Sequence, residues 1–178
     1  MGEKYPLPPI TLRYQGLFDF DGFYATVIDW AKNYGYMWHE KAYKHKVPSP
    51  KGAEQEMDWE MTTNVTEFVR FTIIINLHAW DMTEVEVEVD NRKKNLTNAR
   101  LILKINGSVN TDWQSKFASG TPFAKKLGAL YEKMVAGKEI VAYWDPLYYR
   151  IWNLHAVIKK YFDMQAKKNA YKGYIGEN

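Results

Sequence analysis

The sequence predicts an α+β fold in which a curved antiparallel sheet of about six strands grips a long C-terminal helix. Between Tyr36 and Val109 several segments alternate apolar and polar residues, which is typical of strands with one buried face. Short polar turns join these segments, so neighbouring strands are expected to run antiparallel. Asp145–Lys168 instead repeats apolar residues at helical spacing, and a sheet with one apolar face needs such a helix to cover it.

The N-terminal part is predicted to hold one strand and one helix. Residues 1–9 are rich in proline and are expected to be flexible. Ile10–Phe18 alternates apolar and polar residues and is predicted to be the first strand. A helical stripe of apolar residues then covers Phe20–Ala31, and either Asp19 or Asp21 is expected to cap this helix.

A meander of antiparallel strands is predicted next. Its strands are expected at Tyr36–Val47, Ala53–Thr63, Phe68–Trp80, Thr83–Val89 and Ala99–Val109. The segment from Phe68 is nearly continuously apolar and β-branched, which favours a central strand. Arg100 and Lys104 are expected to lie opposite the glutamates of Thr83–Val89.

The C-terminal part is predicted to be helical. A short helix is expected at Pro122–Ala136, followed by a connector. Asp145 and Pro146 form an N-cap and first helical position for the last helix, which is expected to end near Lys168. Residues 169–178 are expected to be flexible, and the whole chain, 1–178, is predicted to form a single domain.

Composition limits the classes of protein to consider. The chain has no cysteine, which excludes disulfides and thiolate metal sites. Its net charge of +3 is far from that of a dedicated nucleic-acid binder. It has no hydrophobic signal-peptide region and no apolar run of roughly 20 residues, so we expect a cytoplasmic protein without membrane insertion. Aromatic residues make up 16%, which suits a bulky core, a lined cavity or an interaction surface.

The order of elements over roughly residues 10–168 resembles the helix-grip fold of the START/polyketide-cyclase (SRPBCC) superfamily. The helix at Pro122–Ala136 and the single helix after the first strand depart from that pattern. The resemblance implies a cavity between the sheet and the last helix. Its expected lining residues are Trp59, Met57, Met61, Phe71, Leu103, Ile151, His155 and Ile158.

A cavity lined by aromatic residues and methionines suits a small apolar or amphipathic ligand, such as a lipid. The leading hypothesis is therefore noncatalytic binding of such a ligand, without a cofactor. The alternative is a structural or assembly protein with a filled core that binds copies of itself, nucleic acid or a ribosome through its charged outer surface. The basic residues for this alternative are Lys41, Lys44, Lys46, Arg92, Lys93 and Lys94.

Catalytic and metal-binding residues are not indicated. The histidines show no helical metal-site spacing, and His39 and His45 lie six residues apart, roughly 20 Å along a strand. The carboxylates of Ala53–Thr63 alternate opposite an apolar face and are expected to be solvated. An enzyme with His155 as general base ranks third among the hypotheses.

Overall fold

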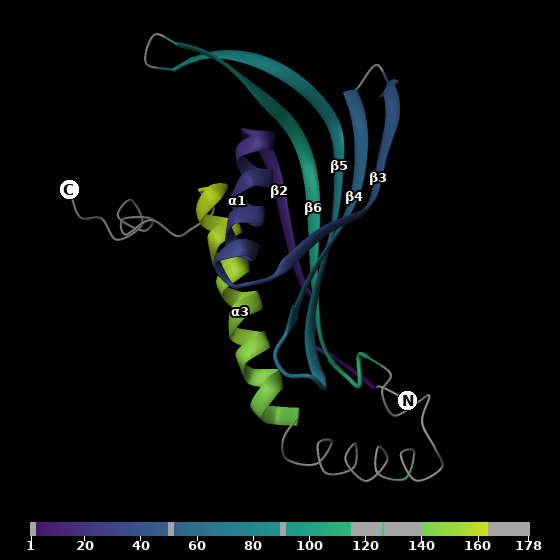
Figure 1. Cartoon of the computed structure of the whole chain (residues 1–178). Coiled ribbons are helices and arrows are strands. Elements are labelled where there is room, and N and C mark those ends of the chain that lie inside the picture. Colours follow the sequence, from purple (N-terminus) through teal and green to yellow (C-terminus); the bar gives the residue numbers. More distant parts are fainter. Residues whose placement is uncertain (1–2, 50–51, 90–91, 115–125, 127–139, 164–178) are drawn as a thin grey trace, which may run out of the picture.

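The computed structural model has an α+β fold, with a six-stranded open antiparallel sheet and helices on one of its faces (Figure 1). It describes residues 3–49, 52–89, 92–114, 126 and 140–163. The strand order is β1-β6-β5-β4-β3, and β2 pairs separately with β6. The last helix is C-terminal to the sheet, as the sequence predicts.

The elements follow the predicted order, with one additional strand at the N-terminus. The strands are β1 (Lys4–Pro6), β2 (Ile10–Phe18), β3 (Met37–Ser49), β4 (Gly52–Asn64), β5 (Val69–Val89) and β6 (Arg92–Thr111). The described helices are α1 (Phe20–Asn33) and α3 (Ile140–Tyr161). Neither helix is long and apolar enough to cross a membrane. Asp19 caps α1, because its carboxylate accepts a hydrogen bond of 2.9 Å from the Gly22 N–H.

β5 is one continuous strand where the sequence predicts two. Asp81 and Met82 lie opposite the single residue Ala99, between the pairs Trp80↔Arg100 and Thr83↔Asn98. Asp81 has a positive φ of 56°, as an extra residue in a bulge can require. The bulge absorbs the irregularity and lets pairing with β6 continue to Val89, so the hairpin extends beyond the helices and bends (Figure 1).

The strand partners of Arg100 and Lys104 differ from those that the sequence predicts. Arg100 lies opposite Trp80 and Lys104 lies opposite Asn76, so neither faces the glutamates beyond the bulge. Arg100 instead donates a hydrogen bond of 2.9 Å to the carboxylate of Asp81. The expected pairing was wrong because the register depends on where β5 and β6 start, which alternation alone does not determine.

The N-terminal segment contains a strand that the sequence analysis did not predict. Residues 4–6 form β1, which pairs antiparallel with residues 108–110 of β6. The Leu7 N–H then donates to the Gly107 carbonyl at 2.8 Å, and the Leu7 side chain is buried. Backbone pairing thus places this segment at the sheet edge, and the flexibility expected for residues 1–9 stays a prediction.

α3 begins at Ile140, before the predicted start at Asp145, and Pro146 lies inside it. Apolar burial holds the helix in place, since Leu147 directly after the proline is fully buried. The described helix ends at Tyr161. The predicted end at Lys168, the tail at 169–178, and all but residue 126 of the helix at 122–136 lie outside the described residues.

The core fills the space between the sheet and the helices. Alternate residues of β4, β5 and β6 are buried on the helix-bearing face, including Met57, Trp59, Met61, Phe71, Ile73, Ile75, Leu101, Leu103 and Ile105. α1 contributes Phe23, Val27, Trp30 and Ala31, and α3 contributes Leu147, Ile151, Leu154 and Ile158. The buried faces predicted for these strands and for both helices are confirmed.

Polar contacts fix the two helices to each other. The Trp30 indole N–H donates to the Asn153 side-chain oxygen at 2.8 Å, and the Tyr34 hydroxyl donates to the same oxygen at 3.2 Å. Near the other end, the Tyr161 hydroxyl donates to the Asp19 carbonyl at 2.6 Å. One side of α3 is therefore reserved for α1.

The close approach of α3 to β6 predicts a cost for enlarging Gly107. A Cβ atom at this position would lie 2.2 Å from the Ile151 Cδ1 atom. We expect Gly107→Ala to lower the free energy of urea unfolding by about 1–3 kcal/mol through overpacking. In an Ile151→Val background, which lacks that methyl group, the same change should cost clearly less. Equal costs in both backgrounds would show that this contact is not the cause.

The environment of Tyr161 predicts a pH dependence of stability. Burial raises the pKa of its hydroxyl to about 12, and the charge of Asp19 adds to the shift. Because the folded pKa exceeds the ordinary value of 10.0, the stabilisation is complete below pH 10 and is lost as the pH rises toward 12. We expect Tyr161→Phe to lack this part of the loss when urea unfolding of both proteins is compared between about pH 10 and pH 12. Parallel declines in the two proteins would contradict the assignment.

Candidate functional site

The residues predicted to line a ligand cavity lie in the packed core. All of them except His155 are buried: Trp59, Met57, Met61, Phe71, Leu103, Ile151 and Ile158. None of them lines any of the three grooves that follow. The described packing favours a filled core, and ligand binding beneath α3 stays a prediction.

His155 lies half-buried on α3, with its ring edge-to-face against Trp152 and 5.2 Å between ring centroids. Burial lowers the pKa of this imidazole, and the positive charge of Lys159 lowers it further. A neutral imidazole is suited to a general base, but His155 lines none of the three grooves. A catalytic role for it therefore stays a prediction.

The predicted basic surface is largely neutralised by carboxylates. Each of its described lysine side chains has a partner: Lys41 with Glu60, Lys44 with Glu56, Lys46 with Glu54, Lys93 with Glu86 and Lys94 with Asp19. The Arg92 side chain lies outside the described residues. The register of β3 with β4 places Lys44 opposite Glu56 and Lys46 opposite Glu54, which sequence alternation alone did not reveal.

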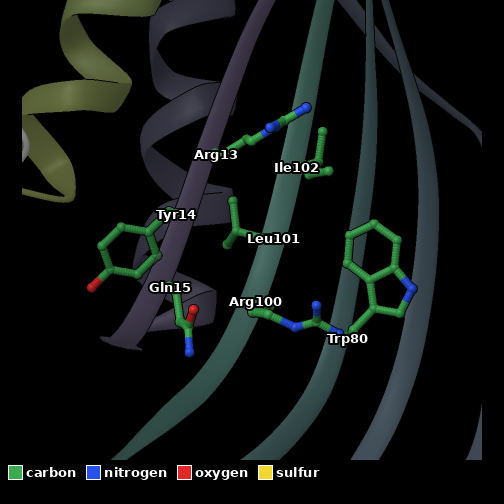
Figure 2. A pocket seen from close by; sticks show the side chains of 7 residues that line it. All are labelled: Arg13, Tyr14, Gln15, Trp80, Arg100, Leu101 and Ile102. Carbon is green, nitrogen blue, oxygen red and sulfur yellow. The ribbon is translucent and has the colours of Figure 1, made fainter.

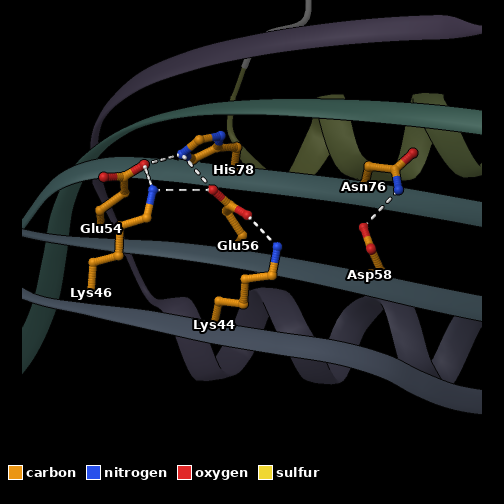
Figure 3. A network of polar contacts seen from close by, with 7 residues as sticks. All are labelled: Lys44, Lys46, Glu54, Glu56, Asp58, Asn76 and His78. Atoms are coloured by element: carbon orange, nitrogen blue, oxygen red, sulfur yellow. Dashed lines mark hydrogen bonds and ion pairs between the residues drawn. The ribbon is translucent and has the colours of Figure 1, made fainter.

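The pairs of Lys44 and Lys46 belong to a polar network on the face of the sheet that the helices leave uncovered (Figure 3). The His78 Nε2 atom lies 2.6 Å from a Glu54 carboxylate oxygen and 3.8 Å from one of Glu56. These three side chains are of types that can ligate a metal ion, and their atoms lie within 4.8 Å of one another. The ammonium of Lys46 contacts both glutamates, at 2.9 and 3.3 Å, and that of Lys44 lies 3.1 Å from Glu56, so two positive charges balance the two carboxylates. The cluster is therefore a set of mutually neutralising charges that links β3, β4 and β5.

Two adjoining grooves, of about 400 and about 480 Å³, cross the uncovered face. Both are lined by Arg13, Trp80 and Ile102, so they form one continuous depression, here called the sheet-face groove. Figure 2 shows the residues of its first part. The first part adds Tyr14, Gln15, Arg100 and Leu101. The second part adds Thr11, Glu56, Asp58, Asn76, Leu77, His78 and Lys104.

Strand register brings these residues together. Ile102 of β6 lies opposite Arg13 on β2 and opposite His78 on β5. One row further along, Arg100 lies opposite Trp80. Because alternate side chains of a strand share a face, Arg13, His78, Trp80, Arg100 and Ile102 all point away from the helices. Ile102 forms an apolar floor between the arginine and the indole (Figure 2).

The aromatic side of the groove is held in place by its neighbours. The rings of Trp80 and His78 stack with 3.7 Å between centroids and an interplanar angle of 21°. The Arg100 guanidinium lies 5.7 Å from the Trp80 ring centroid, while its Nε–H is held by Asp81. The indole is therefore presented in a fixed orientation with a cation beside it.

The positive charge that remains available lies on the β2 and β6 side. Arg13 and Lys104 are exposed, and within the described part of the chain neither has an ion-pair partner. On the β4 side, Asp58 accepts a hydrogen bond of 2.6 Å from the amide of Asn76, which in turn accepts one of 2.9 Å from Asn106. The groove therefore runs from a cationic side to a side rich in hydrogen-bonding groups.

A third groove, of about 300 Å³, lies between the start of α1 and the β5–β6 hairpin. Its lining includes the carboxylates Asp19, Asp21 and Glu84. Lys94 already pairs with Asp19 at 2.8 Å. Its acidic lining distinguishes this groove from the sheet-face groove, which contains the available cations Arg13 and Lys104.

Sequence reasoning missed Arg13 and Lys104 as site residues, although both stand at polar positions of predicted strands.

Comparison with known proteins adds no assignment: no protein-family model and no curated protein matches this chain. The resemblance to the helix-grip superfamily stays a prediction.

The polar network predicts which lysine controls the ionisation of Glu54. The hydrogen bond from Lys46 is the largest cause holding the pKa of Glu54 below its usual range, followed by that from His78. We expect Lys46→Met to raise the pKa of Glu54, measured by NMR titration of the side-chain carboxyl carbon. Lys41→Met removes a lysine paired with Glu60 instead and should leave Glu54 unchanged. An unchanged pKa in Lys46→Met would contradict the assignment.

Proposed function

We propose that this chain is a noncatalytic binding protein whose sheet-face groove holds an anionic ligand of the nucleotide class, free or within a single strand. The observation that carries the proposal is the placement of two cations without ion-pair partners in the described chain, Arg13 and Lys104, beside Trp80 in one continuous groove. Phosphates need cations, and bases need rings or apolar surface, so this combination suits both parts of a nucleotide.

Each part of the ligand has a partner in the groove. The Arg13 guanidinium can donate two parallel hydrogen bonds to a phosphate, and Lys104 supplies a second positive charge. The base rests on Ile102 and meets the indole of Trp80, where stacking or edge contact is independent of base identity. Arg100 adds a cation already held by Asp81.

The charge distribution sets the orientation of the ligand. Asp58 lines the β4 side of the groove and repels a phosphate, and the lysines near Glu56 are already paired with it, so the phosphate lies toward the cations of β2 and β6. The base then faces β5 and β4, where Asn76 and Asp58 offer amide and carboxylate groups to its edges. The combined space falls within the range of about 300–1,000 Å³ that small-molecule sites occupy.

We also infer that the helix-bearing face is a helix-grip arrangement like that of the START/polyketide-cyclase superfamily, with the sheet curved around a long α3. The 22-residue length of α3, the contact of Ile151 over Gly107 and the bend of the β5–β6 hairpin toward the helices support this inference (Figure 1). In this arrangement the packed helices fill the gripped face, which leaves the opposite face for ligand.

Binding measurements on groove variants test the proposed function. We expect fluorescein-labelled oligo(dT) to bind in fluorescence anisotropy, and AMP to bind in calorimetry if free nucleotides are also ligands. Arg13→Ala/Lys104→Ala should weaken oligo(dT) binding at least about tenfold, because charge-assisted hydrogen bonds contribute about 1.5–3 kcal/mol each. The slope of log K against log salt should fall by about 0.7 for each phosphate that the variant no longer neutralises.

Lysines of β3 supply the matched control. Lys41→Ala/Lys44→Ala also removes two positive charges, but from side chains that pair with Glu60 and Glu56. This variant should bind oligo(dT) nearly as well as the wild type. Binding of oligo(dT) without AMP would identify the polymer as the ligand. The proposal fails if the wild type binds neither probe, or if the β3 variant loses affinity while the groove variant keeps it.

A further inference from the structure

α3 has a third side that faces neither the sheet nor α1. Leu147, Ile151, Leu154 and Ile158 face the core, and Asn153 faces α1. At about 100° per residue, a separate stripe centred near Trp152 lies about 100° around the helix from Asn153. We call it the outer seam; its residues are Val141, Asp145, Tyr148, Trp152, Ala156 and Lys159.

The outer seam exposes large apolar side chains in a fixed arrangement. Val141 is 55% exposed and Trp152 is 42% exposed. Tyr148 lies between two tryptophans, with ring centroids 5.2 Å from Trp144 and 6.1 Å from Trp152. Trp144 and Tyr148 are half-buried against the core and hold the exposed Trp152 in place, and an exposed, supported tryptophan is typical of an interface anchor.

We propose that a second copy of this chain covers the outer seam, with the two α3 helices antiparallel about a twofold axis at Trp152. The seam positions 145, 148, 152, 156 and 159 repeat every three or four residues, as in helices that pack along each other. A twofold axis makes the interface self-complementary, so each residue before Trp152 meets the residue equally far beyond it in the other copy.

Charge complementarity favours a second copy of this chain as the partner and an antiparallel direction for the two α3 helices. Asp145 precedes Trp152 by seven residues and Lys159 follows it by seven, so the axis places Asp145 of each copy against Lys159 of the other. Within the described residues neither side chain has an ion-pair partner. A parallel arrangement would instead place like charges together, which disfavours it. A charged residue at each end of the seam also makes a lipid surface a poorer match.

Side-chain size fits the same arrangement. Tyr148 precedes Trp152 by four residues and Ala156 follows it by four, so the large ring of one copy lies over the small methyl group of the other. Alternation of large and small residues lets facing helices approach closely. The sheet-face groove lies on the other face of the sheet, so the dimer leaves both grooves open.

Sedimentation equilibrium with a charge-swap series tests the interface. We expect the wild type to form a dimer that dissociates on dilution. Asp145→Lys places two lysines together at both ends of the seam and should raise the dimer dissociation constant at least about tenfold. The double variant Asp145→Lys/Lys159→Asp exchanges the charges and should return the constant to near the wild-type value. Asp29→Lys makes the same change at an exposed position of α1 and should have no effect.

The restored double variant shows that loss of dimer reflects the interface and not misfolding, and circular dichroism of each variant checks the fold directly. Trp152→Ala should yield a monomer at concentrations where the wild type is a dimer. A wild type that stays monomeric overturns the proposal. A dimer equally strong in all of the variants overturns it as well, since the interface would lie elsewhere. Neither result bears on nucleotide binding, which uses the other face.

Discussion

Pairing between β5 and β6 is the interaction on which the rest of the structure depends. It runs from Val69↔Thr111 to Val89↔Arg92, and the remaining strands attach to it: β4 pairs with β5, while β1 and β2 both pair with β6. A slip of one residue would exchange the two faces of a strand and expose the core. The bulge at Asp81 preserves this pairing along the bent hairpin.

Because of this register, the two faces of the sheet carry different kinds of side chain. The helix-bearing face is apolar and filled by α1 and α3. The uncovered face is polar, and strand neighbours decide which of its charges are compensated. Lysines of β3 meet the acidic residues of β4 directly. Arg13 lies opposite Ile102, and Lys104 lies opposite Thr11 and Asn76, so the residues paired with these two cations are not acidic. The geometry thus concentrates available positive charge beside Trp80, which supports a binding role for this face.

Local periodicity determined much of the fold. The alternation of Met57, Trp59 and Met61 defined the buried face of β4, and the helical stripe around Leu147 and Ile151 defined that of α3. These predictions succeeded because burial of one face imposes the period of the element on its sequence. The start of α3 was missed because Pro146 resembles a first helical position, while packing of the residues around it extends the helix.

The sequence by itself thus determined the α+β class, the order of elements, and which side of each strand is polar. Only the tertiary structure decided which polar residues meet. Arg13 and Trp80 line the same groove because β2 pairs with β6, about 90 residues later in the chain, and β6 pairs with β5. Alternation fixes the face of a strand but not its register with a distant strand, which depends on the packing of the whole sheet. Most of the candidate site was therefore beyond prediction from local pattern.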